Sequence, residues 1–197
     1  MCISNRIRVL IPAVCILLCL SGAIGAQAQT VAAKSNLAHW AFWATPNASL
    51  ELALAPRVTL DVTGGLNLWG AKSDKKMIHW LAQPEARYWL CDVFNGHFVG
   101  LHLHGGQFNA GHQDIPIGRL KVLKDARYEG YFYGAGLSYG YQWILSRHWN
   151  LEASLGAGYA RIHYEKYPCA TCGAKLGEGA VNYWGITRAT LSLVYLF

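Results

Sequence analysis

The feature that most constrains this chain is a strict alternation of side-chain type over Gly130–Ser146, a stretch without a charged residue. Apart from Phe132, one alternate set is small or polar, and it includes four glycines. The other set is Tyr131, Tyr133, Ala135, Leu137, Tyr139, Tyr141 and Trp143. A period of two residues is typical of a β-strand with different surroundings on its two faces, and four glycines would be costly in a helix. The stretch is therefore predicted to be a strand.

The same alternation recurs along the chain, and it predicts eight strands. These are residues 35–44, 48–55, 58–69, 79–90, 96–108, 127–144, 149–164 and 182–197. The links after the second, fourth and sixth strands are short, whereas those after the third, fifth and seventh are long, at 70–78, 109–126 and 165–181. The first link is short and breaks this rule. Short turns at one end and long loops at the other are typical of outer-membrane barrels.

The composition agrees with a barrel in a membrane. Only 14% of the residues are charged and 53% are hydrophobic, which excludes a disordered chain. Lipid cannot satisfy the backbone of an open sheet, so a spanning sheet must close on itself. The fold is therefore predicted to be all-β, a monomeric eight-stranded antiparallel up-and-down transmembrane β-barrel. The main rival is a soluble barrel with an apolar interior, but the large apolar set would not fit inside eight strands.

Aromatic residues near the strand ends are expected to form girdles at the two membrane interfaces. They are Trp80, Tyr88, Trp89, Tyr141, Trp143, Trp149 and Tyr195. Phe197, which follows apolar residues at every second position, looks like the terminal signal recognised by the barrel-insertion machinery.

Residues 1–28 have the pattern of a cleaved secretory signal peptide. Arg6 and Arg8 precede an apolar run, and Ala26-Gln27-Ala28 is a small-x-small cleavage site. The alternative is a retained anchor, but the run is shorter than the ~20 apolar residues of a spanning helix. Residues 29–197 are then the barrel domain, located in the bacterial outer membrane with both termini in the periplasm. Export excludes nucleic acid as a partner, although the net charge is +6.

Six charged residues fall on the small and polar face, so they are expected inside the barrel. They are Glu51, Asp61, Glu85, Arg87, Glu152 and Arg188. Side chains fill the lumen of an eight-stranded barrel, and an unpaired buried charge there is costly. These residues are predicted to form an ion-paired plug that leaves no wide water channel.

Several segments carry a resemblance that covers nearly all of residues 29–197. They are His79–Trp89, Asn95–Phe98, Tyr131–Trp143, Asn150–Ala153, Tyr164–Gly173 and Ser192–Phe197. They resemble a family of small outer-membrane barrels of unknown function from Gram-negative gut and oral anaerobes, some encoded beside fimbrial genes. The resemblance implies an outer-membrane barrel in a surface-appendage context and brings no catalytic residues.

The sharpest local motif is Cys169-Ala-Thr-Cys172 in the last long link. In an oxidising compartment the pair is expected to be a disulfide that closes the loop. The alternatives are a redox pair, which usually starts a thioredoxin-like helix, and half of a zinc site, which needs two more ligands. Cys91 is expected at the opposite rim.

His102 and His104 share the inward face of their strand, and His112 lies nearby in sequence. Three histidines could hold a metal, but no carboxylate spacing completes a site. The two inward residues are expected to be hydrogen-bonded lumen fillers, and no metal or other cofactor is expected.

Basic residues cluster in the long links at the predicted outer rim. They are Lys72, Lys75, Lys76, Arg119, Lys121, Lys124 and Arg127. They are expected either to contact lipopolysaccharide phosphates or an acidic partner, or simply to be solvated.

The expected role is structural rather than enzymatic. The barrel would present its outer loops for adhesion or for anchoring a surface fibre, with outer-membrane lipid, lipopolysaccharide and fimbrial or other surface proteins as partners. The alternative is a rim-sited lipid A hydrolase or acyltransferase. Ser73, His112, His163 and Glu165 offer suitable groups, but their spacing selects no triad.

Overall fold

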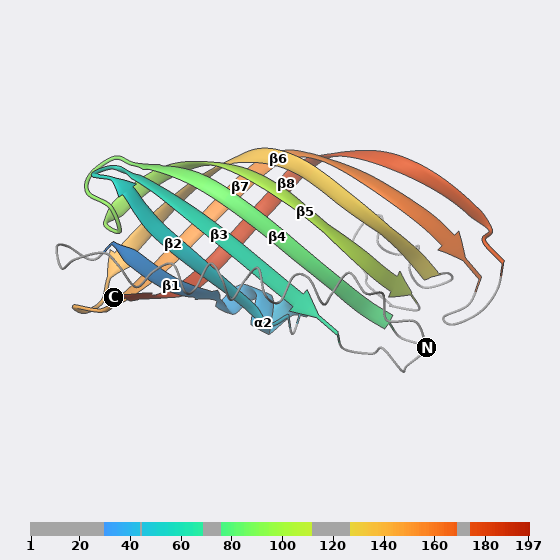
Figure 1. Cartoon of the computed structure of the whole chain (residues 1–197), viewed down its shortest axis with the longest axis horizontal. Helices are drawn as coiled ribbons and strands as arrows, with labels where there is room; N and C mark the ends of the chain where they lie inside the picture. Colours follow the sequence, from blue (N-terminus) through green and yellow to red (C-terminus); the bar gives the residue numbers. More distant parts are fainter. Residues whose placement is uncertain (1–29, 44, 69–75, 112–126, 169–173) are drawn as a thin grey trace.

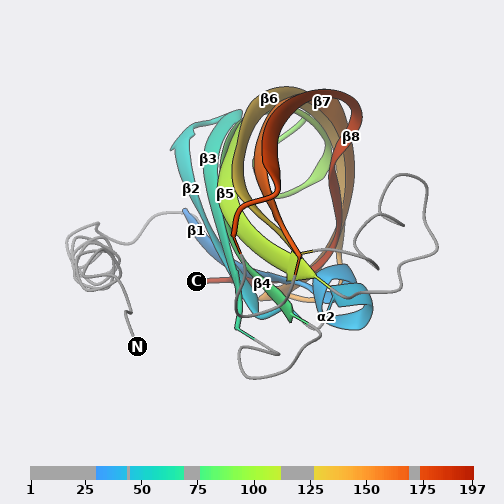
Figure 2. The ribbon, with the colours of Figure 1, turned by 90° about the vertical axis from the view of Figure 1, so that its right-hand side faces the viewer.

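The computed structural model describes residues 30–43, 45–68, 76–111, 127–168 and 174–197. The elements are β1 (Val31–Asn36), α2 (Leu37–Trp43), β2 (Asn47–Ala55), β3 (Val58–Asn67), β4 (Lys76–Trp89), β5 (Gly96–Gly111), β6 (Arg127–Ile144), β7 (Trp149–Tyr167) and β8 (Gly177–Leu196). The eight strands pair in chain order, all antiparallel, and β1 pairs with β8 to close the barrel. The predicted all-β barrel of eight strands is confirmed (Figures 1 and 2).

The prediction for the first strand is wrong over most of its length. The chain was expected to be extended over 35–44, but the strand is Val31–Asn36 and the next seven residues are helical. Two asparagines explain the change. The Asn36 side chain accepts a hydrogen bond from the backbone N–H of Ala38 at 3.0 Å, which is the contact of a helix N-cap. The Asn47 side chain accepts from Asn36 N–H at 2.6 Å and donates to the Asn36 carbonyl at 3.0 Å, so it ends the β1–β2 ladder.

The helix also removes the exception in the link lengths. With α2 included, the first link runs over residues 37–46, so all four links at this end are longer than the three at the other end. The strands lengthen in the same direction around the barrel, from six residues in β1 to twenty in β8. One wall therefore extends far beyond the other toward the long-link end (Figure 1). Among the described residues, no helix has the length and apolar character needed to cross a membrane.

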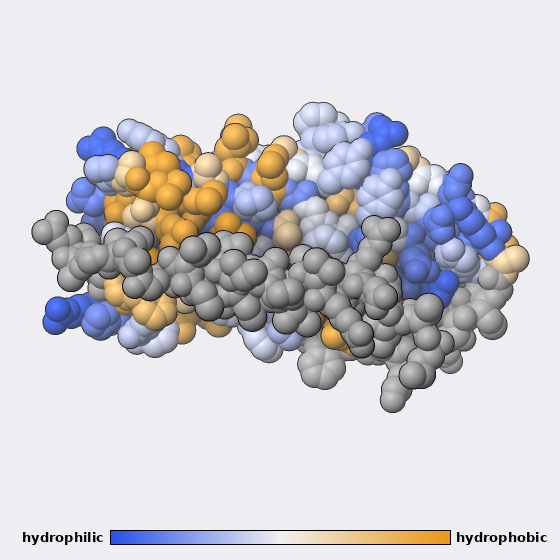
Figure 3. Space-filling view, in the orientation of Figure 1, coloured by the Kyte–Doolittle hydropathy of each residue, from blue (hydrophilic) through white to orange (hydrophobic). Residues whose placement is uncertain are grey.

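The side chains separate by polarity, with charge inside and apolar groups outside. Leu137, Leu155 and Tyr139 are 68%, 58% and 53% exposed, whereas Glu152 is 1% and Arg188 is 5% exposed. Figure 3 shows apolar residues gathered over the part of the barrel near the short turns and hydrophilic residues toward the long-link end. A register shift opposite Gly156 and Ala157 changes the outward set on β8 from odd to even residue numbers, which is why Ile186 and Trp184 face outward.

Candidate functional site

A network of buried charges fills the lumen at the level of β2, β3, β4, β7 and β8. Arg87 is at its centre and lies 2.6 Å from Glu85, 2.9 Å from Glu152, 3.1 Å from Glu51 and 3.3 Å from Asp61. Arg188 approaches the same carboxylates from β8, at 3.1 Å from Asp61 and 3.3 Å from Glu85. Hydroxyl groups of Ser49, Thr59 and Ser138 donate further hydrogen bonds to the carboxylates. The structure brings the six charged residues singled out from the sequence into one connected set.

Lys34 is a seventh member that the sequence analysis missed. Its ammonium group contacts Glu51 and lies 2.6 Å from Glu152 and 3.9 Å from Asp61. It was missed because the first strand was predicted to begin at residue 35. The alternation of Lys34 with its neighbours was the available signal, since the burial of β1 follows a two-residue period. The network therefore joins four carboxylates to three cations.

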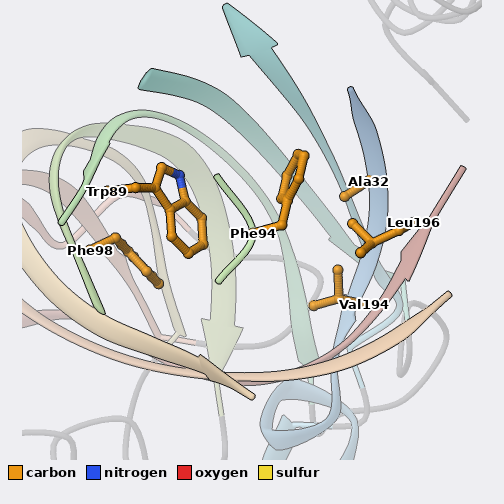
Figure 4. Packing of buried hydrophobic residues seen from close by; sticks show 6 residues of the cluster. All are labelled: Ala32, Trp89, Phe94, Phe98, Val194 and Leu196. Carbon is orange, nitrogen blue, oxygen red and sulfur yellow. The ribbon is translucent and has the colours of Figure 1, made fainter. Parts of the chain in front are cut away.

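A small apolar cluster closes the lumen toward the short turns (Figure 4). It consists of Ala32, Trp89, Phe94, Phe98, Val194 and Leu196. Trp89 packs against Phe98 and Phe94 at ring distances of 4.9 and 6.0 Å, and its indole N–H donates to Thr59 at 2.9 Å. The Arg87 guanidinium lies 4.4 Å from the centre of the Phe98 ring and so joins the apolar layer to the ionic one.

Trp89 differs from expectation, and its neighbour Phe94 has an unusual backbone conformation. Trp89 was placed in an outward girdle, but it is fully buried because it follows Arg87 by two residues on the inward face of β4. Phe94 lies in the turn between β4 and β5 with a φ of 62°, a conformation that is uncommon without a glycine. The Asn150 side chain donates to the Phe94 carbonyl at 3.1 Å and so holds this turn over the lumen.

A histidine layer lies on the other side of the ionic network. His102 and His104 are buried with their rings 5.7 Å apart, and His102 is 2.9 Å from the hydroxyl of Thr187 and 4.0 Å from Glu85. The lumen has little spare room here, because a Cβ at Gly136 would lie 2.7 Å from both His102 Nε2 and the Ala157 carbonyl oxygen. His112 lies outside the described residues. No group of three or more potential metal ligands occurs within the part of the chain that the structure describes.

The outer surface carries an apolar band with aromatic edges. Three neighbouring strands each have an aromatic residue near both edges, namely Trp143 and Tyr133 on β6, Trp149 and Tyr159 on β7, and Tyr195 and Trp184 on β8. The two members on each strand lie ten or eleven residues apart. Neighbouring members also touch across strands, with ring distances of 5.0 Å for Trp149–Tyr195 and 4.9 Å for Tyr159–Trp184.

Beyond this band, the outward faces of β6, β7 and β8 become polar. Glu129, Glu165 and Glu178 are direct cross-strand neighbours. Lys175 lies 2.7 Å from Glu165 and also pairs with Glu178, and the Tyr167 hydroxyl donates to Glu165 at 2.7 Å. The hydrogen bonds from Lys175 and Tyr167 hold the pKa of the Glu165 carboxyl below its ordinary value. The bonds to Glu165 and Glu178 raise the pKa of Lys175. We call Glu165, Tyr167, Lys175 and Glu178 the rim cluster.

Comparison with known families places the chain in one that has no assigned function. The model of a family described as "Protein of unknown function (DUF3575)" matches residues 13–197. The chain belongs to this family. No curated protein matches it. The resemblance found from the sequence motifs is thus correct in naming an uncharacterised family, and the DUF3575 match adds nothing on host or neighbouring genes.

The remaining sites predicted for this DUF3575 chain are only partly described. Cys169 and Cys172, Ser73, and five of the basic residues (Lys72, Lys75, Arg119, Lys121 and Lys124) lie outside the described residues. Lys76 begins β4. Arg127 pairs with Glu129 at 3.1 Å and stacks 4.5 Å from the Tyr167 ring centre, so this basic residue is engaged within the barrel wall. Cys91 is an exposed free thiol in the turn after β4.

The two described residues of the enzymatic alternative are not arranged as a catalytic pair. The His163 ring stacks on Tyr131 at 4.8 Å and accepts a hydrogen bond from Arg161 at 3.3 Å. Glu165 is bound by Lys175 and Tyr167 instead of by His163. A general base needs an orienting partner within hydrogen-bond reach, and here each side chain is occupied by a different neighbour.

Proposed function

We propose that this chain is an outer-membrane β-barrel with a sealed lumen, whose long-link end is a platform for contacts outside the cell. The observation that carries the proposal is the inverted polarity of the molecule. Glu51, Asp61, Glu85 and Arg87 are at most 1% exposed, while Leu137 is 68% exposed. A protein in water gains free energy by burying its leucines. The opposite arrangement is favourable when the outer surface meets lipid.

The height of the apolar band supports this proposal. A strand rises about 3.3 Å per residue, and strands of transmembrane barrels are tilted by about 35–45°. Ten residues between the aromatic edges on β6 and β7 therefore cover roughly 25 Å along the membrane normal. This equals the ~25 Å apolar band of outer-membrane barrels, which aromatic girdles flank in the same way.

The proposal includes an orientation. Residues 1–28 act as a cleaved signal peptide, and insertion of residues 29–197 by the barrel-insertion machinery leaves both termini and the short turns in the periplasm. The polar ends of β6, β7 and β8 then project from the cell. In this orientation we expect the basic residues of the long links to meet lipopolysaccharide phosphates.

The filled lumen favours a structural role over transport. An apolar cluster, an ionic network and a histidine layer occupy the interior one after another. We infer that the barrel is a monomeric support for its outer rim, which serves adhesion or the anchoring of a surface fibre. The protein in planar bilayers should then give no discrete conductance, and steady single-channel steps would contradict this role.

A charge placed on the outer surface tests the membrane location. Leu137→Arg puts an ion at the centre of the apolar band, which in lipid should cost roughly 2–4 kcal/mol of folding free energy. On the surface of a soluble barrel the same change should cost less than about 0.5 kcal/mol. Ala180→Arg, on an exposed position beyond the band, is the matched control and should be nearly neutral in both cases.

The measurement is urea unfolding from lipid vesicles, combined with membrane fractionation. Folded wild-type protein should fractionate with the outer membrane and change its gel mobility on boiling. Equal stability of the two arginine variants would remove the membrane proposal. The lipid A alternative is tested separately, because a deletion strain with an altered lipid A mass spectrum would favour the enzyme over the platform.

A further inference from the structure

The seam of the barrel is closed over only a quarter of β8. β8 has twenty residues and β1 has six, and their pairing ends where Asn36 faces Ser192. The Asn36 side chain completes this end, since it accepts from Leu191 N–H at 3.2 Å and donates to the Ala189 carbonyl at 3.3 Å. Beyond this point, no strand among the described residues pairs with the side of β8 that faces away from β7. We call Gly177–Thr187 on this side the β8 edge.

The β8 edge carries only part of the protection that open strands normally have, namely the register shift at Thr187 and the contact of α2 with β8. Its residues are largely exposed, including Trp184 at 76% and Ile186 at 60%. It contains no proline or lysine, and Glu178 is its one charged residue. Natural sheets usually guard open edges with lysine, proline, bulges or a covering segment. An exposed edge without lysine or proline is a template for another strand.

The chain cannot cover this edge by straightening α2. As a strand, Leu37–Trp43 would carry the chain about 23 Å beyond Asn36. Asn47 is held beside Asn36 by two hydrogen bonds. The four residue steps from Trp43 back to Asn47 cover at most about 14 Å. α2 therefore cannot supply a strand that covers this edge.

A second copy of the barrel in the same membrane is also excluded, and this step depends on the proposed membrane location. Two identical edges pair antiparallel about a two-fold axis perpendicular to the sheet, which would turn one barrel upside down. They pair parallel about an axis along the strands. Because the strands are tilted by about 35–45°, that would set the two barrel axes about 80° apart. Neither arrangement fits one bilayer.

We propose that the β8 edge binds an extended segment of a partner protein, which adds to the barrel wall as an antiparallel strand. Backbone hydrogen bonds supply the affinity, and side-chain contacts select the segment. Apolar or β-branched side chains of the partner pack beside Trp184 and Ile186. A basic residue of the partner lies beside Glu178, which also pairs with Lys175. The Glu178 side chain is 72% exposed at the end of the row formed with Glu129 and Glu165. α2 and Asn36 lie at the end of the site where the pairing of β1 with β8 stops.

The test uses a tethered peptide, so that weak affinity does not hide the interaction. The full chain carries Leu176→Cys and is folded in detergent micelles. Its six native cysteines are changed to serine, namely Cys2, Cys15, Cys19, Cys91, Cys169 and Cys172. The probe is a ten-residue peptide of alternating threonine and valine with lysine near its C-terminal end, joined by a disulfide through a C-terminal cysteine. The control is the same peptide with every second backbone nitrogen methylated, which removes its hydrogen-bond donors while keeping its side chains.

Hydrogen exchange is the readout. The unmodified peptide should slow exchange of amides in Gly177–Thr187 by at least about tenfold, and the methylated peptide should not, since each missing hydrogen bond weakens pairing. Replacing the peptide lysine with glutamate should reduce the protection at low salt. No protection with the unmodified peptide, or equal protection with both peptides, would overturn the inference.

The outcomes separate this inference from the proposed function. A neutral Leu137→Arg with full edge protection would remove the membrane location and leave strand addition standing. Absence of edge protection together with a strongly destabilising Leu137→Arg would remove strand addition and leave the membrane location standing.

Discussion

The barrel contains two clusters of ion pairs whose surroundings are opposite. In the lumen network, Arg87 and its four carboxylates are all at most 1% exposed. In the rim cluster, the side chains of Lys175, Glu165 and Glu178 are 37%, 43% and 72% exposed. Both clusters have short charged contacts, with 2.6 Å between Arg87 and Glu85 and 2.7 Å between Lys175 and Glu165.

The comparison shows that contact distance alone does not decide what an ion pair contributes. In the lumen, removal of one partner leaves the other without water or a replacement, so the cost is large. At the rim, water and salt replace a lost partner, so the cost is small. The difference in burial therefore predicts large losses of stability for substitutions in the lumen network and small losses for similar substitutions in the rim cluster.

The largest effect is expected for Arg87→Met. This change removes the cation shared by Glu51, Asp61, Glu85 and Glu152, and leaves four carboxylates to two cations. We expect a loss of about 3–5 kcal/mol in the free energy of unfolding from vesicles, or failure to fold. Lys175→Met, in the exposed rim cluster, is the control and should change stability much less. Similar losses for the two variants would break the comparison.

A smaller loss is expected for Lys34→Met. Lys34 contacts Glu51 and Glu152 closely and Asp61 only at 3.9 Å, so fewer carboxylates lose a close partner. The cost should be about 3 kcal/mol in the same unfolding assay. Combining it with Arg87→Met should give a non-additive result, because the two cations share acceptors. Strict additivity would mean that Lys34 acts outside the network.

Gly136→Ala tests how full the lumen is. The added methyl would lie 2.7 Å from His102 and from the Ala157 carbonyl oxygen, so the histidine layer must move. We expect a loss of about 1–3 kcal/mol. Gly177→Ala is the rim control, because a Cβ there meets nothing within 4 Å. It should be neutral, and two neutral variants would show that the lumen has room to spare.

The smallest effect is expected for Lys175→Met, which should leave the unfolding transition unchanged. Its consequence is a change in titration. Lys175 is the main cause of the lowered pKa of Glu165, so this pKa should rise toward its ordinary value in the variant. Any stability that Glu165 contributes is present above its unfolded-state pKa and is lost as the pH falls through its folded pKa. Carbon-13 NMR of labelled glutamate measures the shift, and an unchanged pKa would contradict the assignment.

How far the sequence could predict the site depended on the range of the interactions. The six inward charges were predictable because each has the burial parity of its own strand, and parity is a local property. Lys34 was missed because the predicted first strand began one residue after it, and α2 was not predictable, since residues 35–44 are apolar enough for either a strand or a helix. The choice was made by Asn47, which bonds Asn36 across the β1–β2 ladder. Trp89 was assigned to a girdle because an aromatic residue near a strand end fits two locations equally well, the membrane interface outside the barrel and the end of the lumen inside it.

By itself, the sequence determined that the chain forms a closed sheet with small and charged residues inside and large apolar residues outside. A two-residue period places alternate side chains on opposite faces of a strand, so each residue's face can be read from its position. Tertiary structure alone decided which carboxylate meets which cation, where β8 shifts register, and where β1 stops beside it. These outcomes depend on strands far apart in sequence, such as Asn36 beside Ser192. No local sequence pattern specifies which distant residues become neighbours. The open edge of β8 can therefore be identified only from the pairing of β1 with β8 in the closed barrel.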